Sequence, residues 1–250
     1  MATPIEAPAQ EPRPVLEDRG IELDGVVRRY GALTALHGVS LRAAPGEVVA
    51  VVGPSGCGKS TLLELVCGLQ RPDAGTVRSA PAVLMPQRDL LLPWMSALDN
   101  AALAPRIGGA RRDAARDAAR PTFAALGLGG FEDARPHELS GGMRQRVAFA
   151  RTLLSGKPVL CLDEPFGALD AMTRTDMQAW LAGALARTPR TVLLVTHDVE
   201  EAAVLADRVL VLSPRPATVV AEIAVPAARP RAVTDAGVVD ARRRALEALR

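Results

Sequence analysis

Short runs of apolar residues alternate along the chain with longer segments in which apolar positions recur with a helical period. The unbroken runs are strand-sized, and polar or glycine-rich sequence follows each; they span residues 48–52, 82–85, 159–162, 192–195 and 209–212. This alternation is typical of a parallel sheet covered by helices on both faces. The pattern therefore predicts an α/β fold, in which ligands bind outside the carboxyl ends of the strands.

The sequence before the first run follows other patterns. Residues 21–43 alternate apolar and polar positions around turn residues, so we expect antiparallel strands that form a flanking sheet. Residues 1–20 mix proline with acidic residues and lack the cationic start and apolar centre of a secretory signal. We interpret these twenty residues as a disordered tail.

Two later segments break the strand rhythm. Residues 88–157 are rich in alanine and arginine and are punctuated by Pro105, Pro121 and Pro136, which predicts a helical insertion. Residues 235–250 predict an amphipathic closing helix with an apolar side. That side is expected to carry Val238, Val239, Leu246 and Leu249.

Composition and charge exclude several classes of protein. Of 250 residues, 48% are hydrophobic, and 30 basic against 28 acidic side chains leave a net charge of +2, so we expect no nucleic-acid partner. No apolar stretch approaches the roughly 18 residues that cross a bilayer. The three cysteines form no metal-binding pair, which suggests a reducing cytoplasm without structural zinc.

A phosphate-binding loop follows the run at residues 48–52. Its pattern is that of a P-loop NTPase and comprises Gly53, Pro54, Ser55, Gly56, Cys57, Gly58, Lys59, Ser60 and Thr61, with a helix expected over residues 62–69. Glycines allow backbone N–H groups to converge on phosphate oxygens at a helix start. We expect Lys59 to contact the β- and γ-phosphates of ATP, Ser60 to ligate Mg²⁺, and Thr61 to add a phosphate contact. A glycine-rich turn with an exposed lysine is the less favoured interpretation.

Further polar side chains follow the other predicted strands. Asp163 and Glu164 come directly after residues 159–162, where Asp163 suits the metal and Glu164 suits activation of the attacking water. Gln87 can reach metal or water through its amide, although a polar turn residue explains it as well. His197 can bond a γ-phosphate oxygen, whereas an isolated histidine there would more often cap the helix beginning at Val199.

A second helix start with anion-binding character occurs far from the first. Leu139 is followed by Ser140, Gly141 and Gly142 and then by a helix expected over residues 144–154. The run Leu139-Ser140-Gly141-Gly142-Met143-Arg144-Gln145-Arg146 closely resembles the signature motif of ATP-binding cassette (ABC) ATPases. The likeness extends over about residues 21–213. It departs from the family at Met143, where glutamine is usual.

The resemblance implies a fold, a set of site residues and a mode of assembly. The fold is a RecA-like P-loop NTPase with a mostly parallel sheet, a flanking antiparallel β subdomain and an inserted helical subdomain. One ABC ATPase domain would span residues 21–225, with the insertion at about 88–157 and a C-terminal tail and helix at 226–250. Tyr30 would stack on adenine, and Gln87 would also serve as the glutamine loop that senses a membrane partner. Asp163, Glu164 and His197 would be the metal, catalytic and switch residues, and residues 167–170 would communicate between two cassettes.

In such a cassette, ATP closes a head-to-tail homodimer in which Ser140, Gly141 and Gly142 of one copy cover the nucleotide held by the other. The implied partners are two integral membrane permease subunits and, indirectly, an external substrate-binding protein, at the cytoplasmic face of the cell membrane. Residues 88–100 suit the permease contact, although core packing explains their apolar density equally well.

Leu92-Pro93-Trp94 and residues 166–174 are similar to bacterial importers of nitrate, sulfonate, taurine and thiamine precursors. The cassette does not touch the cargo, so its sequence does not encode cargo chemistry. A soluble ABC ATPase that acts on ribosomes or nucleic acid, an exporter cassette, and a P-loop kinase are the alternatives. The kinase would leave Ser140 unexplained.

Overall fold

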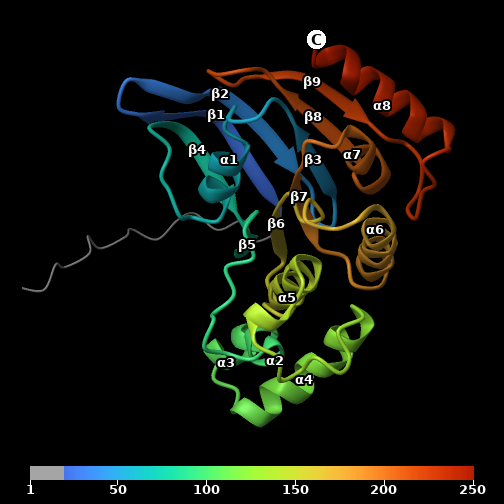
Figure 1. Ribbon diagram of the computed structural model, residues 1–250. Coiled ribbons are helices and arrows are strands. Elements are labelled where there is room, and N and C mark those ends of the chain that lie inside the picture. The colour runs from blue at the N-terminus through green and yellow to red at the C-terminus, as the bar shows by residue number, and fades with distance from the viewer. Residues whose placement is uncertain (1–19) are drawn as a thin grey trace, which may run out of the picture.

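The computed structural model describes residues 20–250, and the predicted tail falls almost wholly outside them. Within these residues the chain forms two sheets with helices packed around them (Figure 1). The larger is six-stranded, in the order β5-β6-β7-β3-β8-β9. Its strands are β3 (Val48–Val52), β5 (Ala82–Met85), β6 (Val159–Asp163), β7 (Thr191–Val195), β8 (Arg208–Leu212) and β9 (Val219–Ala224).

The five apolar runs are all strands, as predicted, and they pair in parallel. The apolar patterns did not predict β9, which pairs antiparallel with β8. Every residue of β3, β6 and β7 is buried, because both faces of the sheet are covered. Successive residues of β3 face opposite sides: Val49 and Val51 belong to one core cluster, and Val48, Ala50 and Val52 to another.

A smaller antiparallel sheet covers one face. Its order is β2-β1-β4, formed by β1 (Ile21–Tyr30), β2 (Leu33–Ala43) and β4 (Ala74–Ser79). This confirms the predicted flanking sheet. Between it and the larger sheet packs α1 (Lys59–Val66), which shares the core cluster of Val49 and Val51. Helix α1 begins three residues before the predicted start at residue 62 and ends before Gly68, whose φ is +79°.

The opposite face carries the remaining helices. The insertion forms a lobe below the sheet in Figure 1 and comprises α2 (Ala97–Ala101), α3 (Leu103–Ile107), α4 (Arg112–Ala125), a 3₁₀ turn (Pro136–Glu138) and α5 (Gly141–Leu153). Helices α6 (Ala171–Arg187), α7 (Val199–Leu205) and α8 (Ala236–Ala248) complete the layer. The prediction that Pro105 and Pro121 punctuate helices is wrong, since both lie inside them. The buried face of α4, made by Ala115, Ala119 and Phe123, continues past Pro121.

The predicted apolar side of the closing helix is also partly wrong. Val238 is buried and Leu249 packs against the core, but Val239 and Leu246 are exposed. The buried stripe of α8 instead runs through Val238, Ala241 and Ala245, which recur at helical spacing and contact α7 and β9. Small alanines let the helix approach its neighbours closely, so the larger side chains beside them point outward.

Candidate active site

The carboxyl ends of four neighbouring parallel strands meet at one edge of the large sheet. The phosphate loop follows β3, Gln87 follows β5, Asp163 ends β6, and His197 follows β7. A cavity of about 370 Å³ opens at this edge. Its lining consists of Ser55, Gly56, Gly58, Lys59, Ser60, Thr61, Gln87, Asp163 and Glu164. The topology therefore brings residues separated by more than a hundred positions into one site.

The phosphate loop has a backbone that requires glycine at Gly58. Its φ is +124°, and a Cβ at this position would lie 2.8 Å from Cδ2 of Leu36. Lys59 is buried, and its ammonium donates hydrogen bonds to the carbonyl oxygens of Gly53 (2.8 Å) and Pro54 (3.0 Å). The lysine thus closes the loop on itself. Cys57 is buried below the loop, so its side chain contributes packing and its backbone forms the turn.

Asp163 lies opposite the loop and is only 7% exposed. Burial raises the pKa of its carboxyl group, and the neighbouring carboxylate of Glu164 raises this pKa further. A hydrogen bond with the Ser60 hydroxyl and the positive charge of Lys59 act in the opposite direction and lower it. A carboxylate desolvated in this way favours a nearby cation. The hydroxyl and carboxylate oxygens are ligands that Mg²⁺ prefers. Residues 20–250 contain no cluster of three or more histidine, cysteine or acidic side chains suited to a metal, so phosphate oxygens and water would have to complete the coordination.

Glu164 is the centre of a small polar group. Its Oε2 accepts a hydrogen bond from Nε2 of Gln87 (2.9 Å), and its Oε1 lies 3.3 Å from Nδ1 of His197. Its backbone φ is +47°, an uncommon value outside glycine, and its N–H donates to the carbonyl of Val195. Asp198, not His197, caps α7, because its carboxylate accepts from two backbone N–H groups of the first turn. The imidazole of His197 does not cap the helix and contacts Glu164 instead.

Tyr30 lies beside the cavity and is 42% exposed. Its hydroxyl donates to Oε1 of Gln70 (2.8 Å) and lies 3.4 Å from Oγ1 of Thr61. The guanidinium of Arg28 covers its ring at 4.8 Å from the centroid. Neither Arg28 nor Gln70 was predicted from the sequence. Arg28 stands two positions before Tyr30 on the same strand, a spacing that could have indicated it, whereas nothing in the sequence indicated Gln70.

Ser140, Gly141 and Gly142 do not line the cavity. Ser140 caps α5, its hydroxyl accepting from the backbone N–H of Met143 (3.2 Å), and Ser140 and Gly141 are exposed to solvent. Met143 itself is packed against the core. Helix α5 therefore begins three residues before the predicted start, at the glycines. One copy of the chain holds the two predicted anion-binding helix starts apart.

Arg174 links two segments that the sequence analysis treated separately. Its Nη2 donates to the carbonyl of Leu169 (3.2 Å), within the loop before α6, and its Nη1 lies 3.7 Å from Oδ2 of Asp198. Behind it, Gln178 donates to the buried carboxylate of Glu201 (3.4 Å). No local sequence pattern indicated the contacts with Asp198 and Glu201, because they join α6 to α7 and its cap.

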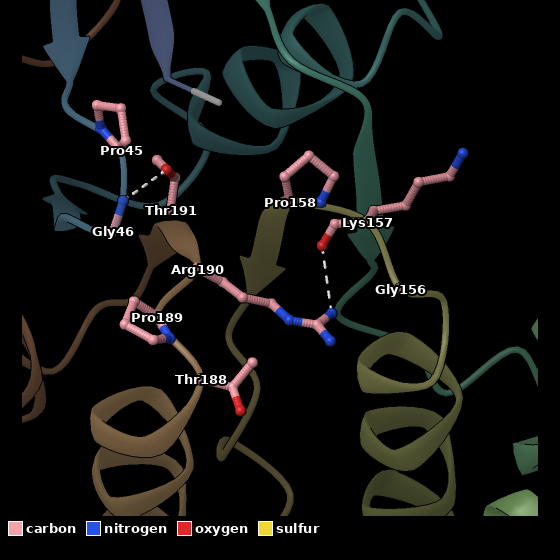
Figure 2. Close-up of a pocket in the computed structure, with 9 residues that line it drawn as sticks. All are labelled: Pro45, Gly46, Gly156, Lys157, Pro158, Thr188, Pro189, Arg190 and Thr191. Carbon is pink, nitrogen blue, oxygen red and sulfur yellow. Dashed lines mark hydrogen bonds between the residues drawn. The ribbon is translucent and has the colours of Figure 1, made fainter. Parts of the chain in front are cut away.

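Another hollow, of about 440 Å³, lies near the amino ends of β6 and β7 (Figure 2). Figure 2 shows Arg190 reaching the carbonyl oxygen of Lys157, and the N–H of Gly46 donating to Thr191. Its lining includes three prolines and no carboxylate. Ligands of parallel α/β sheets bind at the opposite, carboxyl edge, so the cavity around Lys59 is the better candidate.

A family model described as ABC transporter matches residues 36–167, which include the phosphate loop, Gln87, the Ser140 helix start and Asp163 to Gly167. The chain belongs to the ABC transporter family. The predicted ATPase cassette and its P-loop NTPase fold are thereby confirmed. Within residues 20–250, no helix of this ABC protein combines the length and apolar character that spanning a bilayer requires.

Among curated relatives, an aliphatic sulfonates import ATP-binding protein of Rhodococcus jostii is 50% identical over 224 residues, covering 87% of this chain and 88% of the relative. A taurine import ATP-binding protein of Burkholderia pseudomallei is 46% identical over 210 residues, covering 80% and 81%. These ABC relatives fall in the branch that the sequence resembles. Among solved structures, a dimeric post-hydrolysis state of the ATP-binding cassette MJ0796, bound to ADP and Pi, superimposes with a TM-score of 0.75. It is 29% identical and covers 83% of this chain and 99% of that one.

Proposed function

We propose that the chain is the ATP-hydrolysing subunit of a bacterial ABC importer. The observation that carries the proposal is the convergence of Lys59 and Ser60 with Asp163 and Glu164 in one cavity. The cationic loop suits the triphosphate, and the desolvated carboxylate of Asp163 suits the metal ion that accompanies it. The second carboxylate, that of Glu164, suits activation of the water that hydrolyses the nucleotide.

The residues of the cavity divide the chemistry between them. Lys59 would exchange its carbonyl contacts at Gly53 and Pro54 for phosphate oxygens, while the loop N–H groups bind the rest of the triphosphate. Ser60 and Asp163, with Gln87, would hold Mg²⁺, which supplies neutralisation of phosphate charge when bound. Tyr30, steadied by Arg28, would stack on adenine.

Glu164 is the residue best suited to accept a proton from the attacking water. It is 19% exposed, so it is partly desolvated without being sealed from the cavity. Gln87 and His197 contact its two carboxylate oxygens and so limit its rotation. This orientation favours one position for the water. His197 contacts Glu164 but does not itself line the cavity, and it would bond the γ-phosphate once nucleotide is present.

A second copy of the chain would complete the site. Ser140, Gly141 and Gly142 form a helix start outside the cavity. Ser140 and Gly141 are exposed, and the N–H groups of this start would be available to an anion. A head-to-tail homodimer brings this start over the nucleotide bound to the other copy. The dimeric state named for the MJ0796 structures supports this arrangement.

The segment after Gln87 is the surface that we assign to two membrane permease subunits. Leu90 is 57% and Trp94 is 70% exposed, whereas Leu91, Ala97 and Leu98 are buried. Core packing therefore explains the buried members of residues 88–100, and the permease contact that we propose falls on the exposed pair. The outward pair suits short helices of a membrane partner, which would locate the chain at the cytoplasmic face of the cell membrane.

Small sulfonates such as taurine, or nitrate, are the cargo that we propose, delivered by an external substrate-binding protein. The names of the relatives support sulfonates in particular. The cargo would act through the permease, since the cavity described here suits nucleotide.

Co-purification with ATPase measurement tests the proposal. The wild type is expected to hydrolyse Mg²⁺-ATP and to retain a pair of membrane proteins from detergent-solubilised membranes. Trp94→Ala should lose that pair while keeping ATP hydrolysis. The matched control is Ile107→Ala, which removes another apolar side chain, 80% exposed, from the same lobe. Recovery with ribosomes or nucleic acid, or absence of hydrolysis, would contradict the proposal.

A further inference from the structure

Two arginines of α5 hold the segment that follows Gln87. Arg144 Nε donates to Oδ2 of Asp89 (3.1 Å), and Arg151 Nη2 donates to the carbonyl oxygen of Asp89 (2.7 Å). Arg151 Nη1 also donates to the carbonyl of Leu90 (3.0 Å). The two arginines stand seven positions apart, so they project from one side of the helix. Side chains from two different turns of α5 are therefore hydrogen-bonded to Asp89 and Leu90.

The held segment is a tight turn. Oδ1 of Asp89 accepts from the backbone N–H of Leu91 (3.2 Å), and Leu90 has a φ of +43° in the left-handed region. Asp89 therefore bonds its own turn with one carboxylate oxygen and Arg144 with the other. Burial lowers the pKa of the Arg151 guanidinium, and the nearby charge of Asp89 opposes this shift.

Arg144 also reaches the start of its own helix. Its Nη1 donates to the carbonyl oxygen of Leu139 (2.7 Å), the residue directly before Ser140. A guanidinium is planar and rigid, so one side chain fixes the position of Leu139 relative to Asp89. Among the described residues, the side-chain hydrogen bonds of Arg144 go to these two positions, and none goes to the phosphate loop.

We propose that Arg144 is a positioning residue that transmits the position of the Asp89 turn to the Ser140 helix start. Leu90, within the turn, and Trp94, beyond it, are both exposed and would move with the turn when a membrane partner binds. The inference rests on the proposed function, since it assumes that Ser140 closes over the nucleotide of a second copy. It adds the side chain that joins the permease-facing segment at Asp89 to the helix start at Ser140; we call the contacts of Arg144 with Asp89 and Leu139 the Arg144 bridge.

Removing the Arg144 bridge should impair dimer closure and leave nucleotide binding to the monomer unchanged. The test uses the full chain carrying Glu164→Gln, which is expected to form an ATP-bound dimer, and measures sedimentation across an ATP titration with Mg²⁺. Adding Arg144→Ala should raise the ATP concentration for half-maximal dimerisation about tenfold, the effect expected for losing charged hydrogen bonds. Binding of a fluorescent ATP analogue to the monomer should change less than about twofold, because the phosphate loop is untouched.

Two further variants keep the result interpretable. Asp89→Asn retains an oxygen for the Leu91 turn, weakens the contact with Arg144 and removes the charge that acts on Arg151. It should therefore show the same defect even where Arg144→Ala folds poorly. Asp89→Asn with Arg144→Ala should be no worse than Arg144→Ala alone. Arg146→Ala is the matched control: it lies on the same helix and donates to the carbonyl of Leu126 (2.9 Å) instead.

The outcomes separate the two proposals. Failure of the Glu164→Gln parent to dimerise would overturn the proposed assembly itself. Dimerisation of the parent with unchanged ATP dependence in Arg144→Ala, or an equal loss in Arg146→Ala, would overturn the positioning role alone. Fully additive effects of Asp89→Asn and Arg144→Ala would do the same.

Discussion

Nδ1 of His197 lies 3.3 Å from Oε1 of Glu164, at the carboxyl edge of the sheet. The contact restricts a carboxylate that also accepts from Gln87, so His197→Ala should leave Glu164 free to rotate. We expect turnover to fall by at least about tenfold with ATP affinity kept within about threefold, because orientation acts on the chemical step. Steady-state hydrolysis and equilibrium ATP binding check this. His137→Ala, at an exposed histidine of the 3₁₀ turn, should change neither quantity.

Lys59 is expected to determine phosphate affinity. In the structure its ammonium is bonded to the carbonyls of Gly53 and Pro54, so it already lies inside the loop that would hold the phosphates. Lys59→Ala should weaken ATP binding by at least about tenfold, since it removes a desolvated cation from the site. Lys157 is the only other lysine of the sequence and provides the control. Equal ATP affinity in Lys59→Ala and Lys157→Ala, measured by calorimetry, would argue against the cavity as the nucleotide site.

The strands and the phosphate loop could be predicted from sequence because both depend on local patterns. Unbroken apolar runs gave all five parallel strands. Helix starts were predicted late at Leu62 and Arg144, since the glycines and the serine of each motif already belong to the first helical turn or its cap. Counting large apolar residues failed at α8, where Ala241 and Ala245 make the buried stripe.

Contacts between distant segments could not be predicted. The contacts of Glu164 with Gln87 and His197 depend on the order of the strands in the sheet, and no local sequence pattern determines that order. The same holds for Arg144 with Asp89 and for Arg174 with Asp198, which join elements more than twenty residues apart. The chemical groups of the site could be predicted from local motifs, whereas the topology determines which of them meet.

Asp99 should stabilise the helical lobe at neutral pH. It is 4% exposed, and a hydrogen bond from Arg112, together with Ser96 and Arg116, lowers its pKa from 3.8 to about 2. A depressed carboxyl pKa contributes stability that is present above about pH 4 and is lost as the pH falls towards 2. Asp99→Asn should therefore cost about 1–2 kcal/mol at pH 7, and the difference should shrink below pH 4.

Urea denaturation at several pH values measures this difference. Asp117→Asn is the control, because Asp117 is 74% exposed and faces Arg120 at 3.4 Å. That variant should change the free energy of unfolding by less than about 0.5 kcal/mol. A cost for Asp99→Asn that is the same at pH 3 and pH 7 would show that charge does not cause it.

Glu201 should have the opposite pH dependence. Burial is the main cause that raises the pKa of Glu201 from 4.5 to about 7, and the negative charge of Asp198 adds to the rise. Hydrogen bonds from Thr196 and Gln178 and the positive charge of Arg174 partly oppose it. The folded state then binds a proton more tightly than the unfolded state, so stability falls as the pH rises from about 4.5 to 7. Glu201→Gln removes this titration.

The free energy of unfolding of Glu201→Gln, relative to the wild type, should rise by about 2 kcal/mol between pH 5 and pH 8. Parallel thermal or urea unfolding at the two pH values measures it. Because Glu201 belongs to α7 and does not line the nucleotide cavity, the ATP affinity of the variant should match that of the wild type. A constant difference between the two pH values would show that the carboxyl group does not titrate in this range.

The mass of Glu164→Gln in solution shows whether two copies of the chain share one bound nucleotide. Sedimentation is measured with and without saturating Mg²⁺-ATP, because this variant should bind ATP and fail to hydrolyse it. A monomer without nucleotide that becomes a dimer with ATP, and stays monomeric when Ser140→Arg is added, is the predicted result. A protein that binds ATP yet remains monomeric at saturation would contradict the account.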